Sequence, residues 1–412
     1  MFLPLTNGGF SIIMVLYKKH GNGTVMKTKR LFDKSSKIDR FEAVVLSCEP
    51  IEEGKYAVVL DKTAFFPNEG GQSCDTGVID GTSVLSVDEK NGVITHLLDK
   101  PLIVGQTVSC QLDYMVRFKK MQNHTAEHIV SGLIHAEYGF DNVGFHLGEG
   151  YMTADFNGEL TGEMLEGIEY KANLVTAACK QINAYYPDAE TLRSMSYRSK
   201  LDFYENVRIV EIEDTDTCAC CAPHVENTGE VGIIKILDAI RYKGGTRVTM
   251  IAGLDALADY KARLSEIKHI SMAISAKQSE VAERVDRLID EMGKLKGTVS
   301  ALKREMMNGK LAEMGESDGS IILFEEFDDM LALRNLANDA VKKCGKVFAV
   351  FSKAGEGYKY IIASNTLDLK ALSREINSAI DGRGGGSAQM IQGSCNASEG
   401  TIKTFFSNEI YQ

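Results

Sequence analysis

The spacing of hydrophobic and polar residues changes four times along the chain. Between residues 41 and 112, short apolar or alternating runs are separated by glycine and aspartate turns, which predicts six strands. The predicted strands cover 41–47, 56–60, 77–79, 84–87, 93–97 and 108–112. Short strands at this spacing are typical of a small barrel or sandwich, and we expect a small β-barrel in a domain of residues 26–113.

From residue 114 the apolar residues take a helical spacing, which predicts a helix over 114–138. Strand-like and helical pieces then alternate to about residue 252. Such a mixture is typical of an α+β domain, which we place at 114–252.

A 4-3 alternation in which twelve of fourteen positions are apolar, uninterrupted by proline, runs from Tyr260 to Met306. This spacing predicts a coiled coil within a helical segment of residues 253–315. Gly293 and Gly297 either mark a reversal into a helical hairpin or weaken one long helix. The alternative is an amphipathic helix packed on its own domain. We expect this seam to pair two copies of the chain in a homodimer.

The last stretch, residues 320–412, has a β-α-β-β-α pattern. The pieces are 321–324, 330–343, 347–351, 359–363 and 367–380. A glycine-rich loop at 381–387 then leads into residues 388–392. We expect a separate small α/β domain, so that the whole chain is an α+β multidomain protein.

The composition of the chain bears on whether it has a membrane partner and on its cellular compartment. The 412-residue chain contains no apolar run near the roughly 18–20 residues that a membrane span requires, which predicts no membrane partner. Residues 1–25 precede the patterned sequence and are expected to be an extension. Three of the nine cysteines crowd together at Cys218, Cys220 and Cys221, which fits a metal site in a reducing compartment. We therefore expect a cytoplasmic protein.

Two short motifs combine histidine and cysteine at four-residue spacing. His124 and His128 form an HxxxH motif within the predicted helix, where residues i and i+4 share one face. Cys220 and His224 form a CxxxH motif. Two nitrogen donors from one motif with one sulfur and one nitrogen from the other make a four-ligand set suited to Zn²⁺. Cys218 or Cys221 could replace Cys220 as the sulfur ligand.

Other functions fit parts of this pattern. The segment from His124 to His128 also matches the HxxEH motif of zinc peptidases, in which Glu127 would be the general base. Cys220 and His224 have no role in such a peptidase. A third possibility is a non-catalytic, zinc-stabilised RNA-binding protein, in which the metal only holds the fold.

The two motifs resemble the zinc motifs of the editing domain shared by alanyl-tRNA synthetases and free-standing alanyl-tRNA editing proteins. The segment from Leu60 to Gly77 is similar to the family's Thr-x-Phe…Gly-Gly-Gln…Asp-x-Gly segment. The segment 242–247 looks like the basic turn after the zinc motif, and 384–389 resembles the glycine-rich loop of the DHHA1-type domain. The aminoacylation domain has no counterpart, so the resemblance is to the long free-standing form.

This resemblance implies a hydrolase that deacylates mischarged alanine-acceptor tRNA, carrying serine or glycine, at a zinc site. Thr63 is the candidate for recognising a seryl hydroxyl, because a site built to hydrogen-bond a hydroxyl disfavours the analogue that lacks it. Gln72 is expected to contact the substrate or a water molecule. The resemblance further implies substrate-binding roles for Gly70, Gly71 and Arg247. Whether the metal is catalytic or only positions the substrate is open, since four protein ligands nominally close the site.

The second motif departs from the alanyl-tRNA synthetase pattern. Cys221, Ala222 and Pro223 stand where the synthetases carry Gly-Gly-Thr. Pro223 has no backbone N–H, so the donors near the terminal adenosine of the tRNA are expected to differ. A related editing domain in threonyl-tRNA synthetases also uses HxxxH and CxxxH, and it tolerates proline before the last histidine. The Gly-Gly-Gln segment and the C-terminal glycines favour the alanyl branch.

The net charge of −11, taken alone, argues against a nucleic-acid partner. Nearly all of this excess lies between residues 121 and 250, however, and local basic patches interrupt it. One patch comprises Arg117, Lys119 and Lys120, and another Arg241, Lys243 and Arg247. The distribution predicts modest, salt-sensitive tRNA binding through patches.

Overall fold

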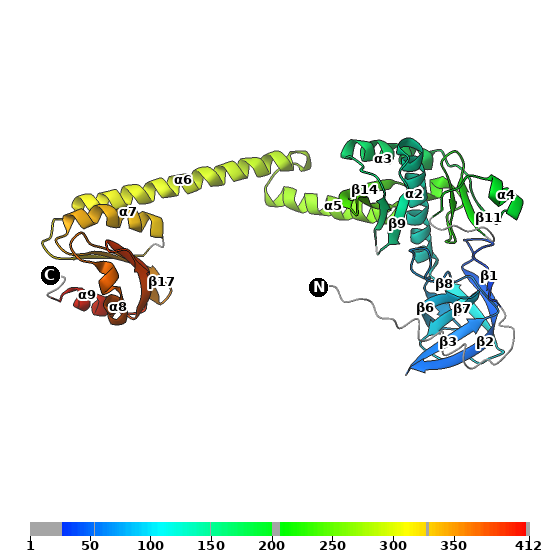
Figure 1. Ribbon diagram of the computed structural model, residues 1–412, viewed down its shortest axis with the longest axis horizontal. Coiled ribbons are helices and arrows are strands. Elements are labelled where there is room, and N and C mark those ends of the chain that lie inside the picture. The colour runs from blue at the N-terminus through cyan, green and yellow to red at the C-terminus, as the bar shows by residue number, and fades with distance from the viewer. Residues whose placement is uncertain (1–26, 53, 149, 200–206, 327–328, 409–412) are drawn as a thin grey trace. The chain divides into compact units, whose positions relative to one another are not determined.

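The computed structural model describes residues 27–408 except 53, 149, 200–206 and 327–328 (Figure 1). The expected extension at 1–25 lies outside these residues. The chain divides into two compact units, Met1–Glu266 and Ile267–Gln412. The predicted boundaries at 113/114, at 252/253 and near 315 are finer than this division and stay predictions.

The predicted N-terminal barrel is confirmed. Six strands close in the order β2-β3-β7-β6-β5-β8. Their bounds are β2 Arg40–Glu52, β3 Lys55–Leu60, β5 Gly77–Ile79, β6 Thr82–Lys90, β7 Val93–Leu98 and β8 Thr107–Leu112. Two short parallel strands, β1 Lys29–Arg30 and β4 Lys62–Thr63, add to the barrel unit. Phe65 and Phe66 are fully buried in its core.

Helix α2, Tyr114–Tyr138, forms over the predicted residues. Its middle is buried around almost its whole circumference, because residues 121–132 contact neighbouring structure on every side. One neighbour is a four-stranded antiparallel sheet in the order β14-β15-β10-β9, and another is helix α3, Gly162–Ala177. The strands are β9 Asn142–Leu147, β10 Met152–Phe156, β14 Ile234–Tyr242 and β15 Gly245–Ala252.

A smaller antiparallel sheet, β11-β12-β13, also borders α2. Its bounds are β11 Ile182–Tyr185, β12 Ile209–Ile212 and β13 Asp216–Ala219, with helix α4, Ala189–Ser194, between the first two strands. A Cβ atom on Gly132 of α2 would lie 2.4 Å from the Thr215 carbonyl oxygen. Glycine therefore lets the β12–β13 turn approach the helix closely, which brings the CxxxH loop that follows β13 near the HxxxH motif.

The expected helical segment is two helices, α5 Gly253–Ala273 and α6 Val281–Glu313. Of the two alternatives for Gly293 and Gly297, the reversal into a hairpin is wrong, because both residues lie inside α6. The break falls at residues 274–280, where Ser275 has a positive φ of 52° and the Ser271 hydroxyl donates to the Ala276 carbonyl. A serine side chain that bonds locally to the backbone competes with helix continuation.

The C-terminal unit has three layers. Its sheet has the order β16-β17-β18-β20-β19, with α7 and the end of α6 on one face and α8 and α9 on the other (Figure 1). The bounds are β16 Ile321–Glu325, α7 Met330–Ala340, β17 Phe348–Ala354, β18 Gly357–Ala363, α8 Leu369–Ala379, β19 Gly382–Gly386, β20 Met390–Cys395 and α9 Glu399–Phe406. The predicted β-α-β-β-α order is present, and α9 was not expected.

The glycine-rich stretch predicted as a loop is a strand. β19 pairs antiparallel with β20, with Gly384 opposite Gly393. A Cβ atom on Gly384 would lie 2.3 Å from the Tyr360 hydroxyl and 2.4 Å from the Gln392 carbonyl oxygen. Glycine here permits close packing against neighbouring strands and does not mark a loop.

Within the described residues, no helix combines the length and the apolar character needed to cross a bilayer.

Candidate metal and active site

The HxxxH motif lies in the buried middle of α2. His124 and His128 are one turn apart, with ring centroids separated by 5.4 Å, and both side chains are almost fully buried. The first histidine also contacts the ring of Phe145 on β9 at a centroid distance of 4.6 Å. The helix therefore presents two oriented imidazoles to one side.

The CxxxH motif comes to the same place from the loop after β13. The Cys220 Sγ lies 3.6 Å from Nε2 of His124 and 3.4 Å from Nε2 of His224. One ligand atom from each of His124, His128, Cys220 and His224 lies within 4.8 Å of the others. Cys220 is thus the thiol among the four convergent donors.

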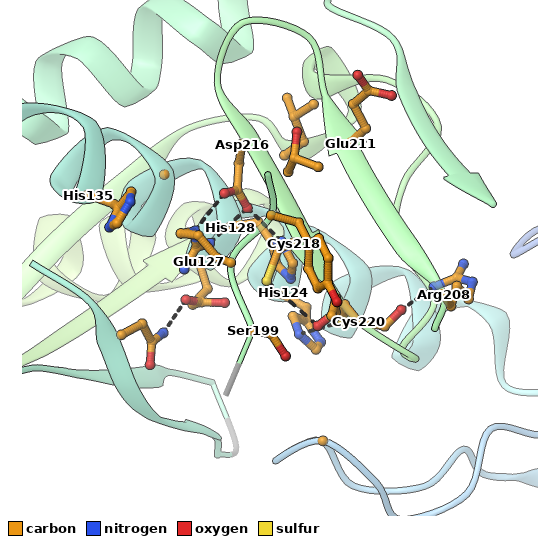
Figure 2. Close-up of a pocket in the computed structure, with 18 of the residues that line it drawn as sticks. His124, Glu127, His128, His135, Ser199, Arg208, Glu211, Asp216, Cys218 and Cys220 are labelled. Atoms are coloured by element: carbon orange, nitrogen blue, oxygen red, sulfur yellow. Dashed lines mark hydrogen bonds and ion pairs between the residues drawn. The ribbon is translucent and has the colours of Figure 1, made fainter. Parts of the chain in front are cut away.

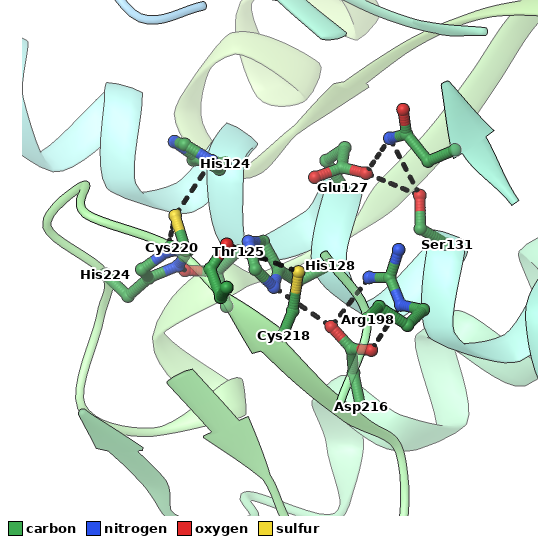
Figure 3. A network of polar contacts seen from close by, with 12 residues as sticks. His124, Thr125, Glu127, His128, Ser131, Arg198, Asp216, Cys218, Cys220 and His224 are labelled. Atoms are coloured by element: carbon green, nitrogen blue, oxygen red, sulfur yellow. Dashed lines mark hydrogen bonds and ion pairs between the residues drawn. The ribbon is translucent and has the colours of Figure 1, made fainter. Parts of the chain in front are cut away.

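Each imidazole has a polar partner at its Nδ1 atom, and Figure 3 shows Asp216 beside His128. Nδ1 of His124 donates to Oε1 of Gln72 at 2.9 Å, and Nδ1 of His128 donates to Asp216 at 3.0 Å. Nδ1 of His224 lies 3.0 Å from the Thr125 hydroxyl. Partners of this kind fix the ring and its tautomer in metal sites. They leave the Nε2 atoms available to a shared ion.

Burial sets the protonation of this cluster in the metal-free chain. Burial, together with Cys221 and Cys218, raises the pKa of the Cys220 thiol well above its ordinary range. Burial, and then the neighbouring His128 and His124, lowers the pKa of His224 well below its ordinary range. Neutral imidazoles are competent ligands, whereas the thiol needs a nearby cation to ionise here. The donor set therefore fits a soft divalent metal.

A second group, His128, Asp216 and Cys218, also brings ligand atoms together. Arg198 occupies its carboxylate, however, with Nε 2.7 Å from Oδ1 and Nη2 2.8 Å from Oδ2 of Asp216. Burial opposes ionisation of Asp216, but the bonds from His128 and Arg198 outweigh it and lower the pKa. A guanidinium in this position disfavours a second cation.

The cluster opens into a pocket of about 1210 Å³ in the N-terminal unit (Figure 2). The pocket is lined by His124, His128 and Cys220. It is also lined by Glu127 from α2 and by Arg208, which directly precedes β12. The Arg208 guanidinium donates to the carbonyl oxygens of Cys220 and Ala222 at 3.0 and 2.8 Å. This contact fixes the loop that carries the thiol, although Pro223 removes a backbone donor from it.

Comparison with known sequences agrees with the motifs. Residues 207–251 match the family described as the threonyl and alanyl tRNA synthetase second additional domain. Residues 20–116 match the family described as tRNA synthetases class II (A). The alanyl-tRNA editing protein AlaX-L of Pyrococcus horikoshii is 27% identical over 388 residues, which cover 90% of this chain and 95% of that protein. The resemblance to the alanyl-tRNA editing proteins is confirmed.

Longer relatives match over part of their length. The alanine–tRNA ligase of Ignicoccus hospitalis is 29% identical over 394 residues, which cover 91% of this chain and 42% of the ligase. The crystal structure of the C-Ala domain from Aquifex aeolicus alanyl-tRNA synthetase matches 22% of this chain and 89% of its own, at 27% identity and a TM-score of 0.19. The chain therefore spans nearly all of the editing protein and less than half of the ligase.

The Gly-Gly-Gln segment that resembles the editing proteins lies beside the cluster. Gly70 lines the pocket, and Gly71 approaches β9, where its carbonyl accepts from the Leu147 amide at 3.0 Å. Both glycines have positive φ, 63° and 80°. Gln72 is buried against His124, and its Nε2 atom has no hydrogen-bond partner among the described residues. The segment thus ties the barrel to the HxxxH helix.

Two other predicted residues lie away from the pocket lining. Thr63 is fully buried in the barrel, where its hydroxyl lies 2.9 Å from Nε2 of His96 and accepts from the Phe65 amide at 3.1 Å. Arg247 on β15 makes two bonds to Asp155, at 2.6 and 2.7 Å, and its guanidinium lies 3.7 Å from the Tyr242 ring centroid. Their expected roles toward substrate stay predictions.

Several residues of the site were not expected from the sequence. Asp216 holds His128, Arg198 holds Asp216, Thr125 contacts His224, and Arg208 holds the CxxxH loop. Asp216 stands in an acidic run just before the cysteine cluster, which offered the one visible sequence clue. Glu127, which would be the general base in the peptidase alternative, is buried.

Proposed function

We propose that this protein is a trans-editing hydrolase that deacylates mischarged alanine-acceptor tRNA. Its substrates are tRNAs carrying serine or glycine, and its reaction is hydrolysis of the 3′ ester. The observation that carries the proposal is the convergence of the HxxxH and CxxxH donors in one pocket, in a chain that spans 95% of an alanyl-tRNA editing protein. No described feature favours a peptidase.

We propose Zn²⁺ as the cofactor, held by His124, His128, Cys220 and His224. Three neutral imidazoles and one thiolate match the nitrogen and sulfur ligands of tetrahedral zinc. The bonds to the three Nδ1 atoms favour this assignment, since metal-binding histidines usually donate through their other nitrogen. Zinc in this position would supply Lewis-acid chemistry toward an ester carbonyl and an attacking water.

The chain's own residues would position the ester. Gln72 orients His124 through Oε1, while its unpartnered Nε2 atom can donate to substrate or water. Gly70 and Gly71 let the backbone turn beside Cys221 and Phe145, because a Cβ atom on Gly71 would lie 2.6 Å from the Phe145 carbonyl oxygen. Thr63 and Arg247 are retained as proposed contributors to specificity and tRNA binding.

A second copy of the chain is the proposed partner of α6. Its apolar seam is solvent-exposed, with Leu295 at 63% and Leu302 at 58%. Fully burying one such side chain contributes about 1.5–3 kcal/mol, so several of them favour association. The pairing would also support a helix weakened by Gly293 and Gly297, because glycine costs about 1 kcal/mol in a helix interior.

The test uses seryl-, glycyl- and alanyl-tRNA with the purified full chain. Loss of the seryl and glycyl esters, sparing of the alanyl ester, inhibition by a chelator and restoration by Zn²⁺ support editing. A peptide library incubated in parallel tests the peptidase alternative. Zinc-dependent thermal stability and tRNA binding with all three esters left intact would contradict the hydrolase and support the non-catalytic RNA-binding alternative.

A further inference from the structure

Glu127 is a buried carboxylate at the edge of the pocket that the proposed zinc chemistry does not use. It lies on α2 between the two histidines of the HxxxH motif and is only 4% exposed. Its Oε1 atom accepts from both the Ser131 hydroxyl and the Asn142 side-chain amide. These two donors fix the carboxylate in one orientation.

The other oxygen of Glu127 is available to a ligand. In Figure 3 it is turned away from Ser131. Within the described part of the chain, Oε2 receives no hydrogen bond, and no lysine or arginine forms an ion pair with Glu127. Arg198, a neighbouring cation, is committed to Asp216 by two bonds. Arg198 interacts with Glu127 electrostatically but forms no bond with it, and a buried carboxylate without a bonded cation beside a pocket is suited to a cationic ligand.

The carboxylate is not a further metal ligand. Neither group of convergent donor atoms includes Glu127, although His128 is its neighbour in sequence. It nevertheless lines the same pocket as His124, His128 and Cys220. A cation bound by Oε2 therefore belongs to a molecule that enters this pocket.

We propose that Oε2 of Glu127 binds the α-ammonium group of the aminoacyl ester. This inference rests on the proposed function, because an aminoacyl-tRNA brings one protonated primary amine next to its ester carbonyl. The ion pair would orient the ester toward the four-donor cluster. It would also select aminoacyl esters over esters that lack a positive charge, since a charge-assisted hydrogen bond is stronger than a neutral one.

The test compares two esters that differ at one group. Deamination of seryl-tRNA converts the ammonium into a hydroxyl of similar size and gives the α-hydroxy ester. In Glu127→Gln, the carbonyl oxygen can still accept from Ser131 and Asn142, but the amide presents a donor toward the pocket. We expect kcat/KM for seryl-tRNA to fall about tenfold or more, mainly through KM, with little change for the α-hydroxy ester.

Glu137→Gln is the matched control, because Glu137 lies on the same helix and pairs with Lys171 outside the pocket. Its kinetics should match the unmodified protein with both esters. If Glu127→Gln lowers kcat for both esters equally, Glu127 is a general base or a structural residue and the inference is wrong. Unchanged preference for the ammonium ester would also overturn it.

A binding measurement separates this inference from the hydrolase proposal. The probe is 3′-serylamino-3′-deoxyadenosine, a stable amide, compared with its α-hydroxy counterpart by calorimetry. Tighter binding of the ammonium form that is lost in Glu127→Gln supports the inference even if no ester is hydrolysed. Equal binding of both forms to the unmodified protein, or binding of neither, contradicts it whatever the hydrolysis result.

Discussion

Asp216 accepts a hydrogen bond from Nδ1 of His128 at 3.0 Å while Arg198 binds both of its carboxylate oxygens. The carboxylate is thereby held on two sides, and its side chain is 2% exposed. Its negative charge favours the Nδ1–H tautomer of His128. The imidazole therefore offers the lone pair of Nε2 to the donor cluster.

Asp216→Asn should weaken zinc binding about 10- to 100-fold, because the carboxylate that sets the His128 tautomer is lost. Competition with a chromophoric chelator measures the affinity, and the Co²⁺ absorption spectrum reports the ligand geometry. Asp214→Asn is the control, since Asp214 lies in the same turn with a side chain 85% exposed. Equal affinities in the two variants would contradict a positioning role for Asp216.

Replacing one convergent donor should abolish stoichiometric metal. We expect one Zn²⁺ per chain in the unmodified protein and markedly less in Cys220→Ala or His124→Ala, because three ligands no longer close the tetrahedral set. Elemental analysis after dialysis measures the content. Cys221→Ser, adjacent in sequence but outside the donor set, should retain its zinc. Metal loss in Cys221→Ser with retention in Cys220→Ala would reverse the ligand assignment.

Zinc affinity should rise with pH. Burial raises the pKa of Cys220, so its thiol is protonated in the metal-free protein. Metal binding must displace this proton. His224 is already neutral, because burial lowers its pKa, and it releases no further proton. Because metal binding displaces this thiol proton, the apparent affinity should increase by at least about tenfold per pH unit between pH 7 and 8. Titrations at several pH values check the slope, and a flat profile would show that no proton leaves.

Gly384→Ala should destabilise the C-terminal sheet by about 1–3 kcal/mol, because the added methyl group would meet Tyr360 and the Gln392 carbonyl. Gly385→Ala provides a matched control on the same strand, with nothing within 4 Å of the new Cβ atom. Urea dependence of amide exchange on β18 and β20 measures the difference. Similar effects of both substitutions would argue against close packing at Gly384.

Leu295→Glu should convert the proposed dimer to a monomer, because it places a charge in the apolar seam of α6. Sedimentation at micromolar concentration measures the mass. Ala301→Glu introduces the same charge on the opposite side of the helix and should remain dimeric. A compact monomer in the unmodified protein would remove the basis of the homodimer proposal.

The sequence predicts the barrel and α2 well because each has a clear period. The predicted ranges 77–79 and 114–138 coincide with β5 and α2. The glycine-rich strand β19 was missed, because glycine in close contact between strands looks the same in sequence as glycine in a loop. The break near Ser275 was missed because neither glycine nor proline marks it.

The candidate site likewise contains some residues that the sequence predicts and others that it does not. The spacing of HxxxH places both imidazoles on one helix face, so the convergence of His124 and His128 could be predicted without coordinates. The residues that hold those ligands come from distant segments, as Gln72 and Asp216 do. No period in the sequence links them to the histidines. The burial of Glu127 likewise depends on packing around a whole helix.

The contact between Gln72 and His124 joins the barrel to helix α2 within the N-terminal unit. Gln72 lies between the short strand β4 and the barrel strand β5, whereas His124 lies on the helix after the barrel. A fragment that begins at Tyr114 would retain all four proposed ligands but lose the acceptor that orients the first of them. Ion binding at the cluster and local opening of the barrel should consequently be coupled. A bound ion should make opening of the barrel slower, and a destabilised barrel should release the ion sooner.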